Sequence, residues 1–456
     1  MTPSATRILM AGLLLLALLP LDKAAASRFQ IIGIADLHSA IDHYPRLLAS
    51  LHQLAADDPD TPRLILLNGD LFEAGDPLAA RSGGKLDWQL LADLRNFGPV
   101  VFNIGNHDFD IVDPAELRKR ADKLGILLIG NVALADGSAP APAAVDISLG
   151  DSLLRIVGVT TDQQATWPAQ WRHQLKLPEP VQWMAQHWPH LTADAELIVL
   201  ASHAGLQADR RMQPLFATGP QPLLFFGAHD HLLLEDSLAG IPYVHAGSGG
   251  EQFALATVET GAGSKVEVSV RLMAAKGPED VAMAAAVQQL RENMLTPAES
   301  ERLGWVGETL SLPAAARWAS TRLQEDPEVD AVFLNHTSFG AGLNAGPLSR
   351  YRFDRFLRFD NGLMQVQVDA ATLRRIKARA QPQQDLPLAE RSGDHLYGVW
   401  PEAVDGQHYR LLTSDWIAMP ANQSRYLGET FAFEPLAGPT IKARLIEALQ
   451  SLPDTR

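Results

Sequence analysis

The chain has 456 residues, of which 46% are hydrophobic and 20% are charged. This composition supports large buried cores and excludes a disordered or low-complexity chain. The formal net charge is −15, so the chain lacks the basic excess with which proteins bind nucleic acid in bulk. Cysteine is absent, which excludes disulfides, thiolate nucleophiles, cysteine zinc sites and iron–sulfur clusters.

Residues 1–26 have the pattern of a secretory signal peptide. Arg7 precedes an apolar run from Ile8 to Leu19, and Ala24-Ala25-Ala26-Ser27 offers small residues for cleavage. The apolar run is shorter than a bilayer-spanning helix requires. We therefore expect cleavage after Ala26 and a periplasmic or secreted protein with no stable membrane anchor.

Residues 27–275 alternate predicted strands with helical patterns. Short apolar runs predict buried strands at Phe29–Ala35, Arg63–Leu67, Val100–Ile104, Ile126–Ile129, Leu153–Val159, Leu197–Ala201, Leu223–Phe226 and Ile241–His245. Helical patterns lie between several of them, including Pro45–Ala55 and Pro114–Leu124. This alternation predicts a layered α/β domain, closed by alternating strand residues from Thr257 to Leu272.

The remaining sequence predicts a connector and a second domain. Residues 276–306 form a polar, helix-prone stretch, which we predict to be a linker. Residues 307–456 then contain a helix (Pro313–Leu323), a strand (Ala331–Leu334), a strand–helix unit (Leu363–Ala378) and a loop (Gln381–Pro387). We expect a smaller α/β domain here.

Five apolar strands of the first domain are followed directly by polar residues. The segments are Asp36-Leu37-His38, Asn68-Gly69-Asp70, Gly105-Asn106-His107-Asp108, Ser202-His203 and His229-Asp230-His231. Ligands of open α/β sheets bind outside the carboxyl ends of the strands. We therefore expect these side chains to converge, although each segment alone is as compatible with a cap, a turn or a core histidine.

The converging donors are nitrogen and oxygen atoms without sulfur, which suit zinc, manganese, iron or cobalt. They number more than one tetrahedral ion can use, and they fit two divalent ions roughly 3.5–4 Å apart that share a carboxylate. The donors are Asp36, His38, Asp70, Asn106, His203, His229 and His231. The histidines without this context, including His43, His52 and His395, we interpret as structural or exposed.

The ordered set of motifs resembles the calcineurin-like metallophosphoesterases. The segments Asp36-x-His38, Gly69-Asp70, Gly105-Asn106-His107-Asp108, His203 and His229-x-His231 occur in that family's order. The chain is most similar to the secreted, two-domain branch of bacterial 5′-nucleotidases. The stretches from Gly346-Pro347-Leu348 to Phe359-Asp360-Asn361 and at Leu411–Asp415 resemble that branch's C-terminal domain.

The resemblance implies a four-layer αββα core with a smaller C-terminal α/β substrate domain. It implies one metal held by Asp36, His38, Asp70 and His231, and another held by Asp70, Asn106, His203 and His229. It also implies that His107, paired with Asp108, is a catalytic residue that binds no metal. The two ions would activate a bridging water as hydroxide, which attacks phosphorus in line with the leaving oxygen.

The resemblance places substrate contacts in the second domain. Asn335 and His336 follow a strand and could face the cleft. The alternative is that Asn335 is a cap and His336 a loop residue. Tyr397, Trp400 and Trp416 could stack on a base, or they could pack within or between the domains. Nucleotidases of the family often have Asn-x-Gly-Gly-Ile-Arg where this chain has Asn335-His336-Thr337-Ser338-Phe339-Gly340, without the arginine.

The resulting functional hypothesis is a dinuclear-metal hydrolase of small phosphoesters, a 5′-nucleotidase in nucleotide catabolism. Its partner would be a nucleotide or another small phosphoester. The absent arginine leaves open a periplasmic thiosulfohydrolase that cleaves a sulfur-containing ester. A non-catalytic binding relative that kept the fold is the third alternative.

Overall fold

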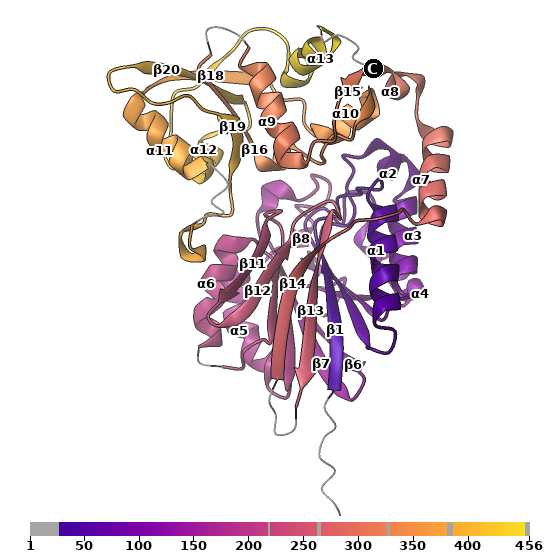
Figure 1. The fold of residues 1–456 in the computed structure, drawn as a ribbon. Coiled ribbons are helices and arrows are strands. Elements are labelled where there is room, and N and C mark those ends of the chain that lie inside the picture. Colours follow the sequence, from indigo (N-terminus) through magenta and orange to yellow (C-terminus); the bar gives the residue numbers. More distant parts are fainter. Residues whose placement is uncertain (1–26, 218, 262–265, 326–328, 381–385, 452–456) are drawn as a thin grey trace, which may run out of the picture.

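The computed structural model describes residues 27–217, 219–261, 266–325, 329–380 and 386–451. Two bodies are stacked in it: a sandwich of two six-stranded sheets, and above it in Figure 1 a smaller body around a five-stranded sheet. The predicted signal peptide lies outside the described residues. Among the residues described, no helix combines the length and apolar character needed to cross a membrane.

The first sheet of the sandwich has the order β14-β13-β1-β2-β3-β4. Strands β1 to β4 are parallel, whereas β13 and β14 are antiparallel additions at one side. The strands are β14 (Val266–Ala274), β13 (Gln252–Thr260), β1 (Ser27–Ile34), β2 (Arg63–Asn68), β3 (Val100–Asn103) and β4 (Leu127–Ile129).

The second sheet has the order β11-β12-β10-β9-β7-β6. Its four central strands are parallel and its two edge strands are antiparallel. The strands are β11 (Leu233–Leu238), β12 (Ile241–Ala246), β10 (Leu224–Gly227), β9 (Leu197–His203), β7 (Ser152–Thr160) and β6 (Ala144–Leu149). A separate short pair joins β5 (Ala133–Leu134) to β8 (Leu175–Lys176).

Helices cover the outer face of each sheet. Phe29 and Ile31 of β1 lie in the core between the sheets, whereas Ile32 and Ile34 pack into the core beneath the helices. The alternation follows from the period of two in a strand. The helices on the first sheet are α1 (Tyr44–Asp57), α2 (Pro77–Ser82), α3 (Lys85–Leu94) and α4 (Pro114–Leu124); on the second they are α5 (Pro180–Thr192) and α6 (Leu206–Phe216). The predicted αββα core is confirmed.

The second body is a five-stranded sheet, in the order β19-β16-β20-β18-β21, with helices on both faces. Its strands are β19 (Leu396–Val399), β16 (Ala331–Asn335), β20 (His408–Ser414), β18 (Leu363–Asp369) and β21 (Glu434–Pro435). On one face lie α9 (Leu312–Leu323), α10 (Arg350–Phe356) and α13 (Ile441–Ser451); on the other lie α11 (Ala370–Ala380) and α12 (Pro420–Tyr426). The predicted smaller α/β domain is thus present.

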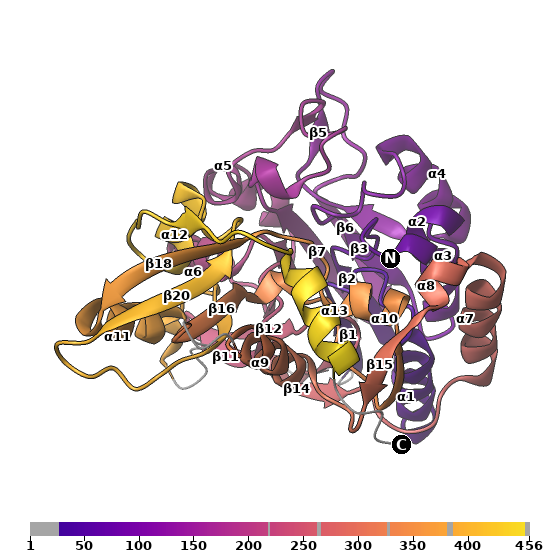
Figure 2. The same ribbon diagram turned by 90° about the horizontal axis from the view of Figure 1, so that it is seen from above.

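The predicted connector forms three elements. Helix α7 (Val281–Met294) lies beside α1 in Figures 1 and 2, and its residues Met283, Val287 and Leu290 pack into the first-domain core. After α8 (Pro297–Ser300), strand β15 (Arg302–Val306) pairs with β17 (Gly346–Ser349). The connector is therefore divided between the two bodies, and the boundaries 27–275 and 307–456 stay predictions.

All eight predicted first-domain strands occur, with ends within two residues of those predicted. Their parallel members end beneath the second body (Figure 1). A buried ion network joins the two bodies there, in which Arg355 of α10 lies 2.8 Å from Asp42 and 2.9 Å from Asp76. The polar residues after the strands are therefore covered by the second domain.

Candidate functional site

The polar residues that follow five strands come together at one end of the sandwich. They follow β1, β2 and β3 of the first sheet and β9 and β10 of the second. Six of the seven predicted donors fall into compact groups able to hold an ion: Asp36 with His38 and His231, and Asp70 with His203 and His229. Residues 195 positions apart in the sequence thus share one site.

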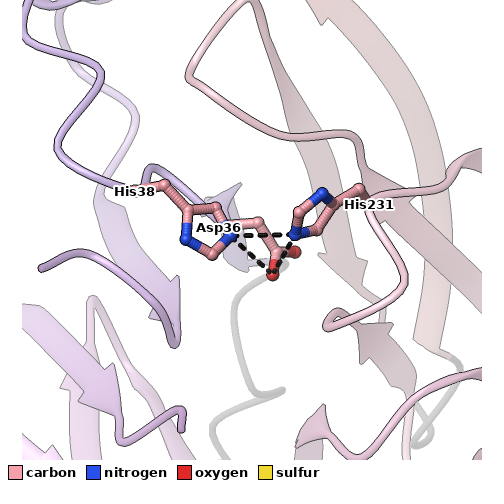
Figure 3. A group of neighbouring side chains, drawn as sticks. All are labelled: Asp36, His38 and His231. Atoms are coloured by element: carbon pink, nitrogen blue, oxygen red, sulfur yellow. Dashed lines mark hydrogen bonds and ion pairs between the residues drawn. The ribbon is translucent and has the colours of Figure 1, made fainter. Parts of the chain in front are cut away.

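Asp36 is at the centre of the first group (Figure 3). Its Oδ1 lies 3.9 Å from His38 Nε2 and 3.8 Å from His231 Nε2, and the two imidazole nitrogens are 2.8 Å apart. The same Oδ1 lies 3.9 Å from His203 Nε2 of the other group. The three nitrogens therefore surround a single carboxylate oxygen.

Asp70 lies between the two groups. Its Oδ2 is 3.9 Å from His38 Nε2 and 3.1 Å from His203 Nε2, while Oδ1 accepts a hydrogen bond from the backbone amide of His107 at 2.7 Å. Gly69, before it, has φ of +81°, and a Cβ there would collide with the ring of His203. Asp70 therefore lies within reach of histidines from both groups, and its bridging of two ions stays a prediction.

Contacts on the far side of the His203 and His38 rings determine which ring nitrogen is available to a cation. His203 Nδ1 lies 2.7 Å from the carbonyl oxygen of Asn68, which can only accept, so Nδ1 carries a proton and Nε2 is the nitrogen left to face a ligand. His38 Nδ1 lies 3.1 Å from Glu73 Oε2, without the geometry of a hydrogen bond, and the charge of this carboxylate favours the same tautomer. Metal-binding histidines usually have such partners, so both rings are prepared to bind a cation through Nε2.

Asn106 gives an independent indication that the site fits a cation. Its side-chain nitrogen donates to the carbonyl oxygen of Thr166 at 3.2 Å, which assigns the other atom as oxygen. That oxygen, Oδ1, is buried and has no hydrogen-bond partner among the described residues. Buried polar atoms are nearly always satisfied, so this oxygen without a partner, on the residue that precedes His107, fits a metal ligand.

The backbone of the site is strained. Asp36, His38, Asp70, His229 and His231 all have positive φ, between 48° and 81°. A non-glycine residue in this left-handed region costs about 1–3 kcal/mol, and such residues cluster at functional sites. The fold therefore holds five predicted ligands in conformations that local preferences disfavour.

The titration behaviour of the chain alone follows from burial and from the neighbouring charges. Burial raises the pKa of Asp36 well above its usual value. Burial would also raise the pKa of Asp70, but His203 and His107 outweigh it and hold that pKa well below its usual value. Burial also lowers the pKa of His231 to about 4. His231 is therefore neutral near pH 7, the form in which imidazole binds metals.

His107 faces the cluster but has a different carboxylate partner from the one predicted. Its Nδ1 lies 2.9 Å from Asp110 Oδ2. Asp108 instead accepts hydrogen bonds from the backbone amides of Gly105 (2.7 Å), Leu71 (2.8 Å) and Asp70 (3.0 Å). The predicted His107–Asp108 pairing is wrong because the segment forms a turn. The amide of Asp110 donates to the carbonyl of His107 in this turn, which brings Asp110 beside His107.

Two of the predicted substrate residues line a cavity of about 500 Å³ between the domains, together with His231. They are His336, whose ring centroid is 6.1 Å from that of His231, and Tyr397. Asn335 is buried; its side chain bonds to the hydroxyls of Thr337 and Ser338 and does not cap the backbone of the short helix that follows. Trp416 packs in the second-domain core and does not line this cavity.

Sequence reasoning missed several residues near the site. Asp110 could have been found from the turn signal, since residues i and i+3 of a turn are adjacent. His395, interpreted as structural or exposed, is buried and stacks on His336 with ring centroids 4.2 Å apart. Glu73 and Arg358 form a buried ion pair beside His38, and no local pattern marks the arginine because its partner is distant in sequence.

Comparison with known proteins identifies the first domain. Residues 29–233 match the family model described as calcineurin-like phosphoesterase. The chain therefore carries a domain of that family, and the resemblance drawn from the sequence is confirmed. A comparison with curated protein sequences found no match.

Solved structures show the same fold over both domains. The 5′-nucleotidase precursor of Thermus thermophilus is 15% identical, with a TM-score of 0.60 over 93% of this chain and 96% of that one. The sulfate thiohydrolase SoxB of Thermus thermophilus is 15% identical, with a TM-score of 0.58 over 92% and 94%. The 5′-nucleotidase of Candida albicans is 11% identical, with a TM-score of 0.57 over 93% and 98%. At these identities the likeness shows the fold alone.

Proposed function

We propose that the protein is a dinuclear-metal hydrolase of small phosphoesters, with nucleotides as the first candidates. The observation that carries this proposal is the convergence of six donors from four strands of two sheets, with Asp70 between the two groups. The phosphoesterase family match of residues 29–233 supports the reaction class.

We assign one ion to Asp36, His38, Asp70 and His231, and the other to Asp70, Asn106, His203 and His229. Bound divalent ions of this kind supply a nucleophile at neutral pH and offset the charge of the phosphoryl group. Which ion is used depends on availability as well as on the donors, and zinc, manganese, iron and cobalt all suit this set.

His107 is the acid of the proposed reaction. Its Nδ1 is occupied by Asp110, so Nε2 is the atom that can protonate a leaving oxygen or bind a phosphoryl oxygen. Burial disfavours the charged ring, but Asp70 and Asp110 raise the pKa of His107 to about 9. Cations held by Asp70 would offset the contribution of Asp70 to the raised pKa of His107. Asp110 is then the partner that keeps the proton on His107.

The cavity between the domains is the proposed site of the leaving group. It includes His231 at the metal end, and His336, His395 and Tyr397 from the second domain. Their rings offer flat faces for a base or sugar, and stacking of this kind accepts different bases. A nucleoside fits a cavity of about 500 Å³ with this lining.

We also propose that the protein is exported. The support is the signal-peptide pattern of residues 1–26. Sequencing the N-terminus of the protein isolated from its native source tests this. A chain that begins near Ser27 is expected, whereas a retained Met1 would contradict cleavage.

The experiment for the reaction is a panel of bis-p-nitrophenyl phosphate, AMP and UDP-glucose, assayed before and after removal of metal with a chelator. We expect hydrolysis of at least one phosphoester, loss of it on chelation, and recovery on adding Mn²⁺, Co²⁺ or Zn²⁺. A protein with two ions bound and no activity on any phosphoester would contradict the proposal.

A second candidate is hydrolysis of a sulfur-containing ester. Its support is the similarity in fold to the sulfate thiohydrolase SoxB over 92% of this chain. The absence of the nucleotidase-type arginine, with Gly340 in its place, also supports it. Release of sulfate and a free thiol from an S-sulfonate (R–S–SO₃⁻), in which water cleaves the S–S bond, without turnover of AMP, would select this candidate. Inactivity on both substrate classes would favour a non-catalytic binding protein.

A further inference from the structure

A buried chain of contacts connects the second domain to the imidazole of His38. Glu73, in the loop after β2, places Oε2 3.1 Å from His38 Nδ1. Its other oxygen, Oε1, accepts a hydrogen bond from the guanidinium of Arg358. The side chains of Glu73 and Arg358 are only 7% and 8% exposed, so solvent screens this pair weakly.

Both ends of the contact are held by the backbone. The amide of Glu73 donates to Ser39 Oγ at 3.0 Å, beside His38. The amide of Arg358 donates to the carbonyl of Ser338 at 2.9 Å. The backbone at both Glu73 and Arg358 is therefore fixed by hydrogen bonds, which limits the movement of the two side chains.

Gly340 provides the space for the arginine. A Cβ on Gly340 would lie 2.9 Å from Arg358 Cδ and 2.7 Å from the carbonyl oxygen of Arg355, closer than side chains tolerate. Gly340 stands where the resembling nucleotidases have an arginine. The segment after α10 can therefore bring its own arginine, Arg358, toward His38.

We propose that Glu73 is a positioning residue for the metal centre, and that Arg358 of the second domain holds Glu73 in place. The Glu73 carboxylate lies 3.1 Å from His38 Nδ1, and its negative charge favours the tautomer with the proton on Nδ1, which leaves Nε2 directed at Asp36 and His231 (Figure 3). One of the two ions would then bind tightly only while Arg358 of the second domain holds Glu73. This inference rests on the proposed metal centre.

The physical reason is that a ligand imidazole binds well only in one tautomer and one orientation. Removing the hydrogen-bond partner of a metal-binding histidine typically weakens metal affinity by about 10–100-fold. His203 has a backbone carbonyl in this role, which no side-chain substitution removes. The two ions should therefore respond differently to a change at Glu73.

The test uses the full-length protein, stripped of metal and titrated with Mn²⁺ alone by calorimetry. In Glu73→Ala we expect one of two binding events to weaken by about 10–100-fold and the other to keep its parental dissociation constant. Glu73→Gln retains an acceptor for His38 and should recover part of the loss. Titration with Co²⁺ should show an altered visible absorption spectrum for the weakened ion only, which a general loss of stability would not produce.

Arg358→Met tests the contribution of the second domain, and Arg355→Met is its matched control. Both arginines are buried and join the two domains, but Arg355 contacts Asp42 and Asp76 instead of Glu73. We expect Arg358→Met to weaken the same binding event as Glu73→Ala, Arg358→Lys to restore part of it, and Arg355→Met to leave both dissociation constants unchanged.

Three results would overturn the inference. Unchanged binding of both ions in Glu73→Ala would remove Glu73 from the centre, and equal weakening of both ions would mean a general structural role. Equal losses of metal affinity in Arg355→Met and Arg358→Met would show that the contact between Arg358 and Glu73 has no specific role. None of these three results concerns hydrolysis, so the phosphoesterase proposal would survive them. A parental protein that binds no divalent ion would overturn both the phosphoesterase proposal and this inference.

Discussion

The loops at the ends of the first-domain strands and the second-domain wall of the cavity are built in different ways. Six of the seven non-glycine residues with positive φ in the described chain lie in those loops, five of them predicted metal ligands. The second-domain residues that line the cavity lie in the first half of α9 and on or beside β16 and β19, and none of them is a non-glycine residue with positive φ.

The difference shows that strained backbone conformations occur where side chains must be positioned accurately. Donors around a cation must lie within a few tenths of an ångström of one geometry, and strained residues persist only where the surrounding structure over-determines them. A wall that contacts a leaving group through ring faces needs no such accuracy. Substitutions in the two regions should therefore have effects of different kinds, from loss of metal to a moderate change in affinity.

The largest effect is expected for Asp70→Asn. A neutral amide bridges two cations poorly, so metal affinity should fall by more than the roughly 10–100-fold that loss of a ligand's hydrogen-bond partner costs. Metal analysis after dialysis should find fewer than two ions per chain. Asp87→Asn is the control, because Asp87 is equally buried in the same domain but bonds to Tyr44. Two retained ions in Asp70→Asn would contradict the bridging role.

His107→Ala should separate catalysis from metal binding. We expect both ions to remain bound while kcat on bis-p-nitrophenyl phosphate falls by about 10²–10⁴-fold, the usual contribution of a positioned acid. His52→Ala, a change at an exposed histidine of α1, should leave kcat unchanged. Parental turnover in His107→Ala would exclude the ring from the reaction.

Asp110→Asn and Asp108→Asn should differ, although the two residues are neighbours of His107. The first removes the anion that supports the His107 cation, so kcat should fall, by less than the about 10²–10⁴-fold expected for His107→Ala. The second turns an amide group toward backbone N–H donors, so the midpoint of thermal unfolding should fall. Kinetics and melting curves of both variants distinguish the roles, and an unchanged kcat in Asp110→Asn would speak against the pairing.

The smallest effect is expected for the second-domain aromatics. Tyr397→Leu removes a ring from the cavity and should raise KM for AMP by roughly tenfold, with kcat little changed. Trp416→Leu, in the core away from the cavity, should lower stability and leave KM unchanged. The opposite pattern would place the stacking position at Trp416.

The sequence was most informative where a motif directly follows a strand. Each of the five polar segments comes immediately after an apolar run, so strand ends and candidate ligands are predicted together. Trp416 could not be assigned in this way, because an aromatic residue in a core and one in a cavity leave the same sequence pattern. The Asp108 assignment was wrong because adjacency in sequence was taken for contact, whereas the turn brings Asp110 to His107.

By itself the sequence determined the layered α/β fold and indicated a set of candidate donors, because hydrophobic periodicity and donor chemistry are local properties of the chain. Only the tertiary structure decided that Asp70 lies between two groups, that Asn106 Oδ1 has no hydrogen-bond partner among the described residues, and that Arg358 reaches Glu73. Those facts depend on contacts between residues up to 285 positions apart. Such contacts are fixed by how the sheets and the two domains pack, and no local pattern encodes them.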